Sequence, residues 1–136
     1  MGKNKSGFKA FTMVEIMVSI LIITVLMAVA IPGYFKHVEK AQGSKALENL
    51  NLIRSAEILY AATFSVYTND LVFLQTYSTF TTNSGDWVYT VNSPTTTTFT
   101  ATATRISPNA YNGRIITIDE NAVVTVDGVI NGIWAQ

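Results

Sequence analysis

The chain has 136 residues, which is enough for one folded domain but not for two. Apolar residues make up 49% of the chain, charged residues make up 13%, and the formal net charge is zero. This balance gives no global electrostatic basis for nucleic-acid binding. The absence of cysteine excludes disulfides, thiol catalysis and cysteine-ligated zinc.

The apolar residues concentrate near the amino terminus. Residues 11–31 carry a single charge, and at about 1.5 Å per residue they span roughly 31 Å as a helix, close to the hydrocarbon thickness of a bilayer. Lys3, Lys5 and Lys9 precede this run, and the next basic residue is Lys36. This charge distribution predicts a membrane helix with its amino terminus in the cytoplasm and the rest of the chain outside.

The one charge inside the apolar run is Glu15. A carboxylate carried toward the middle of a bilayer costs about 2.5 kcal/mol or more, so such a residue usually has a function and a partner. Two other interpretations stay open. Glu15 can be solvated at the level of the lipid headgroups, or the run can be a secretory signal peptide cleaved after Ala28-Val29-Ala30 to leave a soluble domain.

The start of the run resembles the processing site of type IV prepilins and type II secretion pseudopilins. The residues that carry the resemblance are Lys9-Ala10-Phe11-Thr12-Met13-Val14-Glu15. The resemblance implies that residues 1–10 are a leader, removed by a prepilin peptidase between Ala10 and Phe11. It also implies that the new amine of Phe11 is methylated and that Glu15 is the fifth residue of the mature chain. Ala10 departs from the family pattern, which usually has glycine at this position.

The resemblance further implies how the chain assembles. Copies would associate into a helical filament at an inner-membrane assembly platform, with residues 11–33 as the transmembrane and assembly half of a long first helix. Glu15 would meet the Phe11 amine of the same copy or of its neighbour. Because an unpaired buried charge is expensive, this pair would fix the height at which a subunit docks.

The first helix is expected to run without interruption from the membrane into the domain, with a total length of about fifty residues. Pro32 removes a backbone donor and Gly33 adds local freedom. Together they predict a kink or local unwinding near residues 28–33 in a filament, or alternatively a simple kink at the membrane surface. Residues 34–63 are amphipathic, with an apolar stripe that predicts contact with a core. The stripe comprises Ala46, Leu50, Ile53, Ala56 and Tyr60, widened by Leu47 and Leu59.

After residue 64, threonine, serine, asparagine and aromatic residues replace the helix formers. Residues 65–85 are expected to form a loop and a short element. Alternating patterns then predict strands at residues 86–91, 97–104, 114–119 and 122–126. The expected fold is α+β and pilin-like, with the long helix packed on a small antiparallel sheet whose other face shows threonines. Residues 34–136 would form an extracytoplasmic globular domain.

The remaining candidate sites favour a structural role. His37 is the only histidine, and no nucleophile–base pair or phosphate-binding loop is present, so no enzymatic activity is expected. Some secretion pseudopilins bind calcium in a carboxy-terminal loop, which raises a weak calcium hypothesis. Calcium needs six to eight oxygen ligands, and acids that join strands through turns are the favoured interpretation, so no cofactor is expected. The candidates are Asp119, Glu120 and Asp127, with Asn121 and Asn131 nearby.

Three functions follow from these observations. The first is a structural subunit of a type IV pilus-like filament. Such a subunit lies in inner-membrane lipid before assembly and in an extracellular or periplasmic filament afterwards. The second is the major pseudopilin of a type II secretion system. The third, of another class, is a single-span anchored binding domain that never polymerises, which predicts an uncut leader and tolerance of Glu15→Ala.

Overall fold

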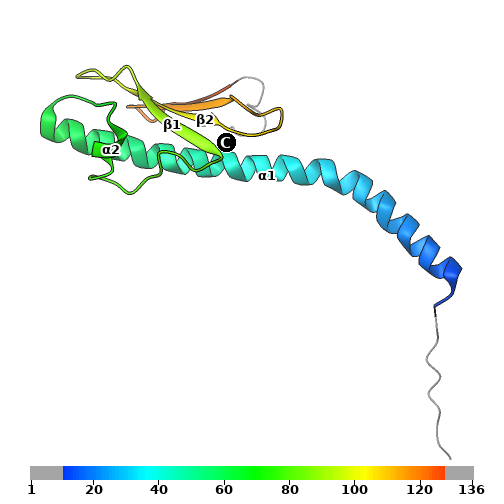
Figure 1. The fold of residues 1–136 in the computed structure, drawn as a ribbon. Coiled ribbons are helices and arrows are strands. Elements are labelled where there is room, and N and C mark those ends of the chain that lie inside the picture. The colour runs from blue at the N-terminus through cyan, green and yellow to red at the C-terminus, as the bar shows by residue number, and fades with distance from the viewer. Residues whose placement is uncertain (1–10, 128–136) are drawn as a thin grey trace, which may run out of the picture. The chain divides into compact units, whose positions relative to one another are not determined.

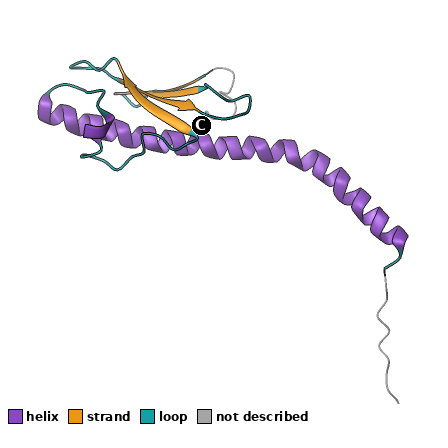
Figure 2. Ribbon diagram, in the orientation of Figure 1, coloured by secondary structure: helices purple, strands orange, loops and turns teal. Residues whose placement is uncertain are grey.

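The computed structural model describes residues 11–127, which separate into two compact units, one up to Lys36 and one from His37. Helix α1 begins in the first unit and ends in the second. The elements in chain order are α1 (Met13–Phe64), α2 (Leu71–Leu74), β1 (Trp87–Asn92), β2 (Thr100–Arg105), β3 (Ile115–Asp119) and β4 (Val124–Val126) (Figures 1 and 2). The expected continuous first helix is confirmed, with a length of 52 residues.

In the second unit, one face of α1 forms the floor of the core. Ala46, Leu50, Ile53 and Ala56 are fully buried, as the apolar stripe predicts, and Tyr60 is half-buried at the end of the same face. Leu59 was expected to widen the stripe, and that expectation is wrong because its side chain is 50% exposed. At about 100° per residue, position 59 lies roughly 120° around the helix from position 53 and points to solvent.

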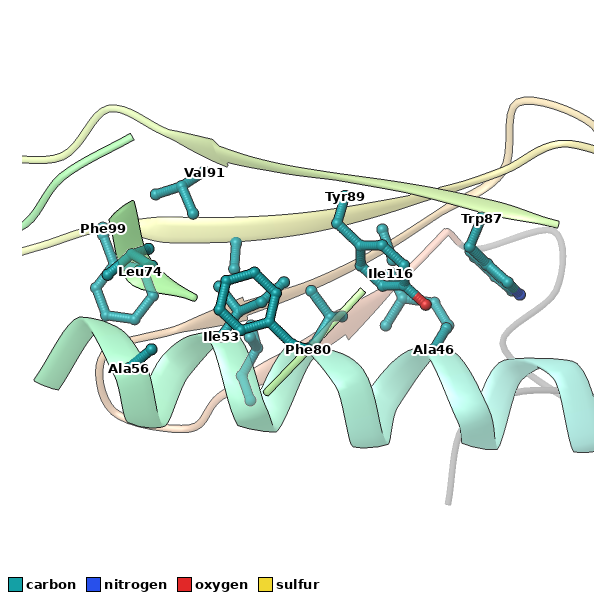
Figure 3. Close-up of a cluster of buried hydrophobic side chains, with 14 residues drawn as sticks. Ala46, Ile53, Ala56, Leu74, Phe80, Trp87, Tyr89, Val91, Phe99 and Ile116 are labelled. Atoms are coloured by element: carbon teal, nitrogen blue, oxygen red, sulfur yellow. The ribbon is translucent and has the colours of Figure 1, made fainter. Parts of the chain in front are cut away.

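The four strands form one antiparallel sheet in the order β1-β2-β3-β4. Each strand pairs with the next one in the chain, so the sheet is a meander, and it lies along one side of the second half of α1 (Figure 1). Inward-facing residues from three strands close the core over the helix (Figure 3). They are Trp87, Tyr89, Val91, Ala101, Ala103, Ile116 and Ile118. The threonines of β2 alternate with its buried alanines and stay partly exposed, so the predicted α+β fold is confirmed.

Two strands begin later than the sequence predicts, because turns occupy their first residues. Before β2, the Thr95 hydroxyl accepts hydrogen bonds from the amides of Thr97 and Thr98, at 3.1 and 2.9 Å, and holds these residues in a turn. Before β4, Ala122 has a positive φ of 63°, and the amide of Val123 is bound by a side chain of the preceding turn. The other two predicted strands agree with β1 and β3 to within one residue.

The short element expected between α1 and β1, whose type the sequence left open, is the helix α2. Asp70 caps α2, since its Oδ1 atom accepts hydrogen bonds from the amides of Val72 and Phe73 at 3.1 and 3.0 Å. Leu74 from this helix and Phe80 after it enter the core (Figure 3). The segment therefore covers the part of the helix face that the sheet leaves open.

Candidate processing and assembly site

The first turn of α1 is built around Thr12 and Glu15. The Glu15 amide donates to the Thr12 hydroxyl at 3.2 Å and to the Thr12 carbonyl at 3.1 Å, so Thr12 acts as the helix N-cap. Phe11 precedes the cap and is 74% exposed. Ala10, the other residue of the expected cleavage site, lies outside the described residues. The N-cap therefore starts the helix directly after Phe11 and places the Glu15 carboxylate one turn into it.

The other polar side chains of the span are satisfied by the helix itself. The Ser19 hydroxyl donates to the Glu15 carbonyl at 2.7 Å, and the Thr24 hydroxyl donates to the carbonyls of Ile20 and Leu21. Between residues 13 and 35, Glu15 is the one charged residue. Unlike the two hydroxyl groups, its carboxylate carries a charge that the carbonyl groups of its own helix cannot neutralise.

The surface around Glu15 is apolar and open. Every residue from 11 to 32 is exposed in the structure, including Met13, Ile16 and Leu21. By its length and composition, α1 is the one helix among the described residues that could cross a membrane. A surface of this size and character requires lipid or other protein around it.

Pro32 and Gly33 mark the end of this apolar stretch. The helix continues without a break through both residues. Pro32 has no amide hydrogen, so the Ala28 carbonyl receives no helical bond from it. A Cβ atom added at Gly33 would meet no heavy atom within 4 Å, so the chain itself does not require glycine there. The expected kink concerns the helix packed in a filament and stays a prediction.

The sequence is similar to those of known proteins. Residues 3–31 match the model of the prokaryotic N-terminal methylation motif, a match that includes Ala10, Phe11 and Glu15. Two fimbrial proteins of Pseudomonas aeruginosa are each 31% identical to this chain over 137 aligned positions, covering 93% of the chain and 82% of each relative. The chain belongs to the type IV pilin family. Pilins are structural, non-enzymatic proteins, and the expectation that this pilin is not an enzyme follows the family.

Sequence reasoning missed a buried ion-pair network in the pilin domain. Arg105 of β2 donates to both carboxylate oxygens of Glu39 on α1, and it also binds Asp86, at 3.1 Å between Nη1 and Oδ1. Asn109 donates to the same Glu39 carboxylate at 3.1 Å. Burial by itself lowers the pKa of Arg105, but the hydrogen bonds that its guanidinium donates to the Glu39 and Asp86 carboxylates, together with their charges, raise the pKa above its usual value. Arg105 is therefore a structural cation rather than part of a nucleic-acid surface.

The candidate calcium ligands take part in turn and ion-pair contacts. Asp119 Oδ1 accepts the amides of Asn121 and Val123, at 2.9 and 2.8 Å, and Glu120 Oε2 accepts the amide of Phe99 at 3.3 Å. Asp127 forms an ion pair with Arg114 at 3.2 Å.

Within residues 11–127, no group of three or more His, Asp or Glu side chains is placed to hold a metal. The remaining calcium candidate, Asn131, lies outside these residues. His37 is exposed on α1. Of the expected site residues, Phe11 and Glu15 lie close together, at the start of α1.

Proposed function

We propose that this pilin is the structural subunit of a type IV pilus-like filament, assembled by packing of its first helix. Residues 1–10 are the leader, residues 11–33 are the membrane and assembly half of the helix, and residues 34–136 are the extracytoplasmic domain. The observation that carries the proposal is the isolation of Glu15. It is the single charge in residues 13–33 of α1, an open apolar stretch whose hydroxyl groups already have partners.

Glu15 has a physical reason to seek the Phe11 amine. Cleavage after Ala10 creates a positive amine one helical turn before the carboxylate. When helices pack against one another, either charge is expensive if it is left alone and much less expensive in a pair. A subunit docked at the wrong height leaves a charge stranded, so the pair selects one register while the apolar side chains supply the contact area.

The partners follow from this route. Before assembly, the helix lies in the lipid of the inner membrane, with the three leader lysines keeping its amino terminus in the cytoplasm. A prepilin peptidase removes the leader, the Phe11 amine is methylated, and an inner-membrane assembly platform adds the subunit to other copies of itself. Both relatives named above are fimbrial proteins, which favours an extracellular pilus over a secretion pseudopilus.

The amino-terminal mass of the protein recovered from membranes or sheared surface filaments tests the proposal. A chain that begins at Phe11 with one added methyl group is the expected result. A chain that begins at Met1 would contradict it and favour a plain anchor, and a chain that begins near Ile31 would indicate a signal peptide. The variant Ala10→Gly restores the residue usual in the family and should be processed at least as completely as the parent chain.

A further inference from the structure

The carboxyl group of Glu57 is buried and has only one hydrogen-bond partner. It lies on the inward face of α1 and is 0% exposed, beside the buried residues Ile53 and Ala56. Its Oε2 atom accepts one hydrogen bond, from the amide of Thr68 at 3.1 Å. Its Oε1 atom has no hydrogen-bond partner. An ionised carboxylate in such a place is costly, whereas a protonated carboxyl is much less so.

The single bond of Glu57 holds the loop that connects α1 to α2. In this loop, residues 65–70, the backbone turns sharply at Ser65, which has a positive φ of 59°. The loop is tied to the rest of the domain by the Thr68 amide on Glu57 and by the Tyr67 amide on the Thr95 carbonyl, at 3.0 Å. The Tyr67 ring also packs against Phe99, with ring centres 4.8 Å apart. Thr68 is thus the point at which a buried acid and a surface loop meet.

Among residues 11–127, no charged group forms a hydrogen bond or ion pair with Glu57. The titratable groups nearest to Glu57 along α1 are Arg54 and Tyr60, the loop that it holds carries Tyr67 and Asp70, and the β3–β4 turn that Arg54 binds carries Glu120. Arg54 is the nearest cation along the helix, and its Nε and Nη2 atoms bind the Glu120 carbonyl, at 3.1 and 2.8 Å. Burial raises the pKa of Glu57 to about 7, and the Thr68 amide only partly opposes this rise.

We propose that Glu57 is a proton-linked latch for the 65–70 loop. The protonated carboxyl keeps the loop seated on α1, and the ionised carboxylate loosens it to reach water. The loop leads into α2, where Phe73 packs edge-on against Tyr60 with ring centres 5.7 Å apart. Phe64 and Phe73 are about half exposed. Loosening the loop therefore alters an aromatic surface of the domain.

The direction of the pH effect follows from the two pKa values. Glu57 has a pKa of about 7 in the folded domain and 4.5 when it is exposed. The latch is at full strength below about pH 4.5, weakens as pH rises from there to about 7, and is lost above that value. Opening of the loop gains up to about tenfold per pH unit within this window.

Hydrogen exchange of the 66–70 amides tests the proposal in the full-length chain, held in detergent micelles. Exchange is compared at each pH with the variant Glu57→Gln, which cannot ionise, so the intrinsic pH dependence of exchange cancels. The expected result is a wild-type to variant ratio that rises between about pH 4.5 and 7 and then levels off. A ratio that stays constant across this range would overturn the proposal. The matched control Glu48→Gln, an exposed acid on the same helix, should exchange as the parent does.

A second measurement keeps the proposal testable if Glu57→Gln does not fold. The carboxyl carbon of Glu57 in the unmodified chain is followed by NMR while the pH is changed. A midpoint near 7 supports the latch, and a midpoint at or below the ordinary value of 4.5 rules it out. Neither readout depends on whether the chain polymerises, so the latch and the proposed filament function fail or succeed separately.

Discussion

Arg105 stands opposite Trp87 in the β1–β2 register, and its guanidinium carbon lies 5.6 Å from the centre of the Trp87 ring. Both side chains are almost fully buried. The ring covers one side of the cation while Glu39 and Asp86 bind its nitrogen atoms. The sheet is therefore held to α1 by a charge that is almost fully shielded from water, in a domain that has no cysteine to cross-link it.

Replacing Glu39 with alanine should be strongly destabilising. The change leaves the Arg105 cation buried with only the half-exposed Asp86 carboxylate, and breaking such a pair costs about 3–5 kcal/mol. Urea unfolding of the detergent-solubilised chain, followed by tryptophan fluorescence, measures the loss. The double variant Glu39→Met with Arg105→Leu should lose less stability than Glu39→Ala alone. A loss below about 1 kcal/mol for the single variant would contradict this account.

Replacing Glu15 with valine should block assembly without unfolding the domain. The variant removes the charge that we propose selects the register but keeps the helix apolar, so membrane insertion should be preserved. Sheared surface material is assayed for pilin while the membrane fraction is checked for folded protein. The control Ser19→Ala removes a hydroxyl that binds only its own helix in the structure, and it should assemble normally. Normal filaments from Glu15→Val would show that Glu15 does not select the height at which subunits dock.

Leu50 and Leu59 form a matched pair of leucines on one helix. Leu50 is fully buried, so Leu50→Ala should cost about 2–5 kcal/mol through lost burial and a cavity. Leu59 is half exposed, and Leu59→Ala should cost under about 1 kcal/mol. Chemical unfolding of both variants gives the comparison. Equal losses would mean that the outward face of α1 is buried in the solubilised chain, for example by another copy.

Asp119 should stabilise the β3–β4 turn without metal. Asp119→Ala removes the acceptor for two turn amides and should cost about 1–2 kcal/mol. Thermal unfolding of the parent chain should be the same with added calcium and with a chelator. A rise in melting temperature with calcium that Asp119→Ala abolishes would instead establish a calcium site at this turn.

The architecture was predictable because its signals are periodic. The three- and four-residue spacing from Ala46 to Ala56 gives the buried helix face, and alternation in residues 100–105 gives a strand with alanines inward and threonines outward. The predicted first residues of the strands were less accurate. Threonine is common in strands, but its hydroxyl can also accept hydrogen bonds from nearby amides and form a turn, as Thr95 does.

The two buried acids were missed although the sequence carries a signal for them. Glu39 and Glu57 fall in phase with Leu50 and Ile53 at three- and four-residue steps, but charged residues on a helix are normally assigned to solvent. Arg105 continues the inward alternation of Ala101 and Ala103 on β2 and so could have been matched with an acid on the helix. Which acid it meets depends on how the helix and sheet are packed, and that is not a local property.

The residues of the first helical turn lie close together in the sequence, and their roles in cleavage and assembly stay predictions. Phe11, Thr12 and Glu15 lie within five residues, so the cap and the position of the carboxylate follow from helix geometry alone. The partner of Glu15 in a filament is a different matter, because it belongs to contacts between copies and no local pattern encodes its position.

The hydroxyl groups of Ser19 and Thr24 carry their hydrogen-bond acceptors with them, on the preceding turn of their own helix. Moving this stretch from lipid to protein surroundings therefore breaks no polar contact and requires no new one. Dispersion contacts with acyl chains are exchanged for similar contacts with side chains, and the free energies of the two environments nearly balance. Within residues 13–33, Glu15 is the one charged side chain, so in the proposed assembly a single carboxylate sets the direction of the transfer.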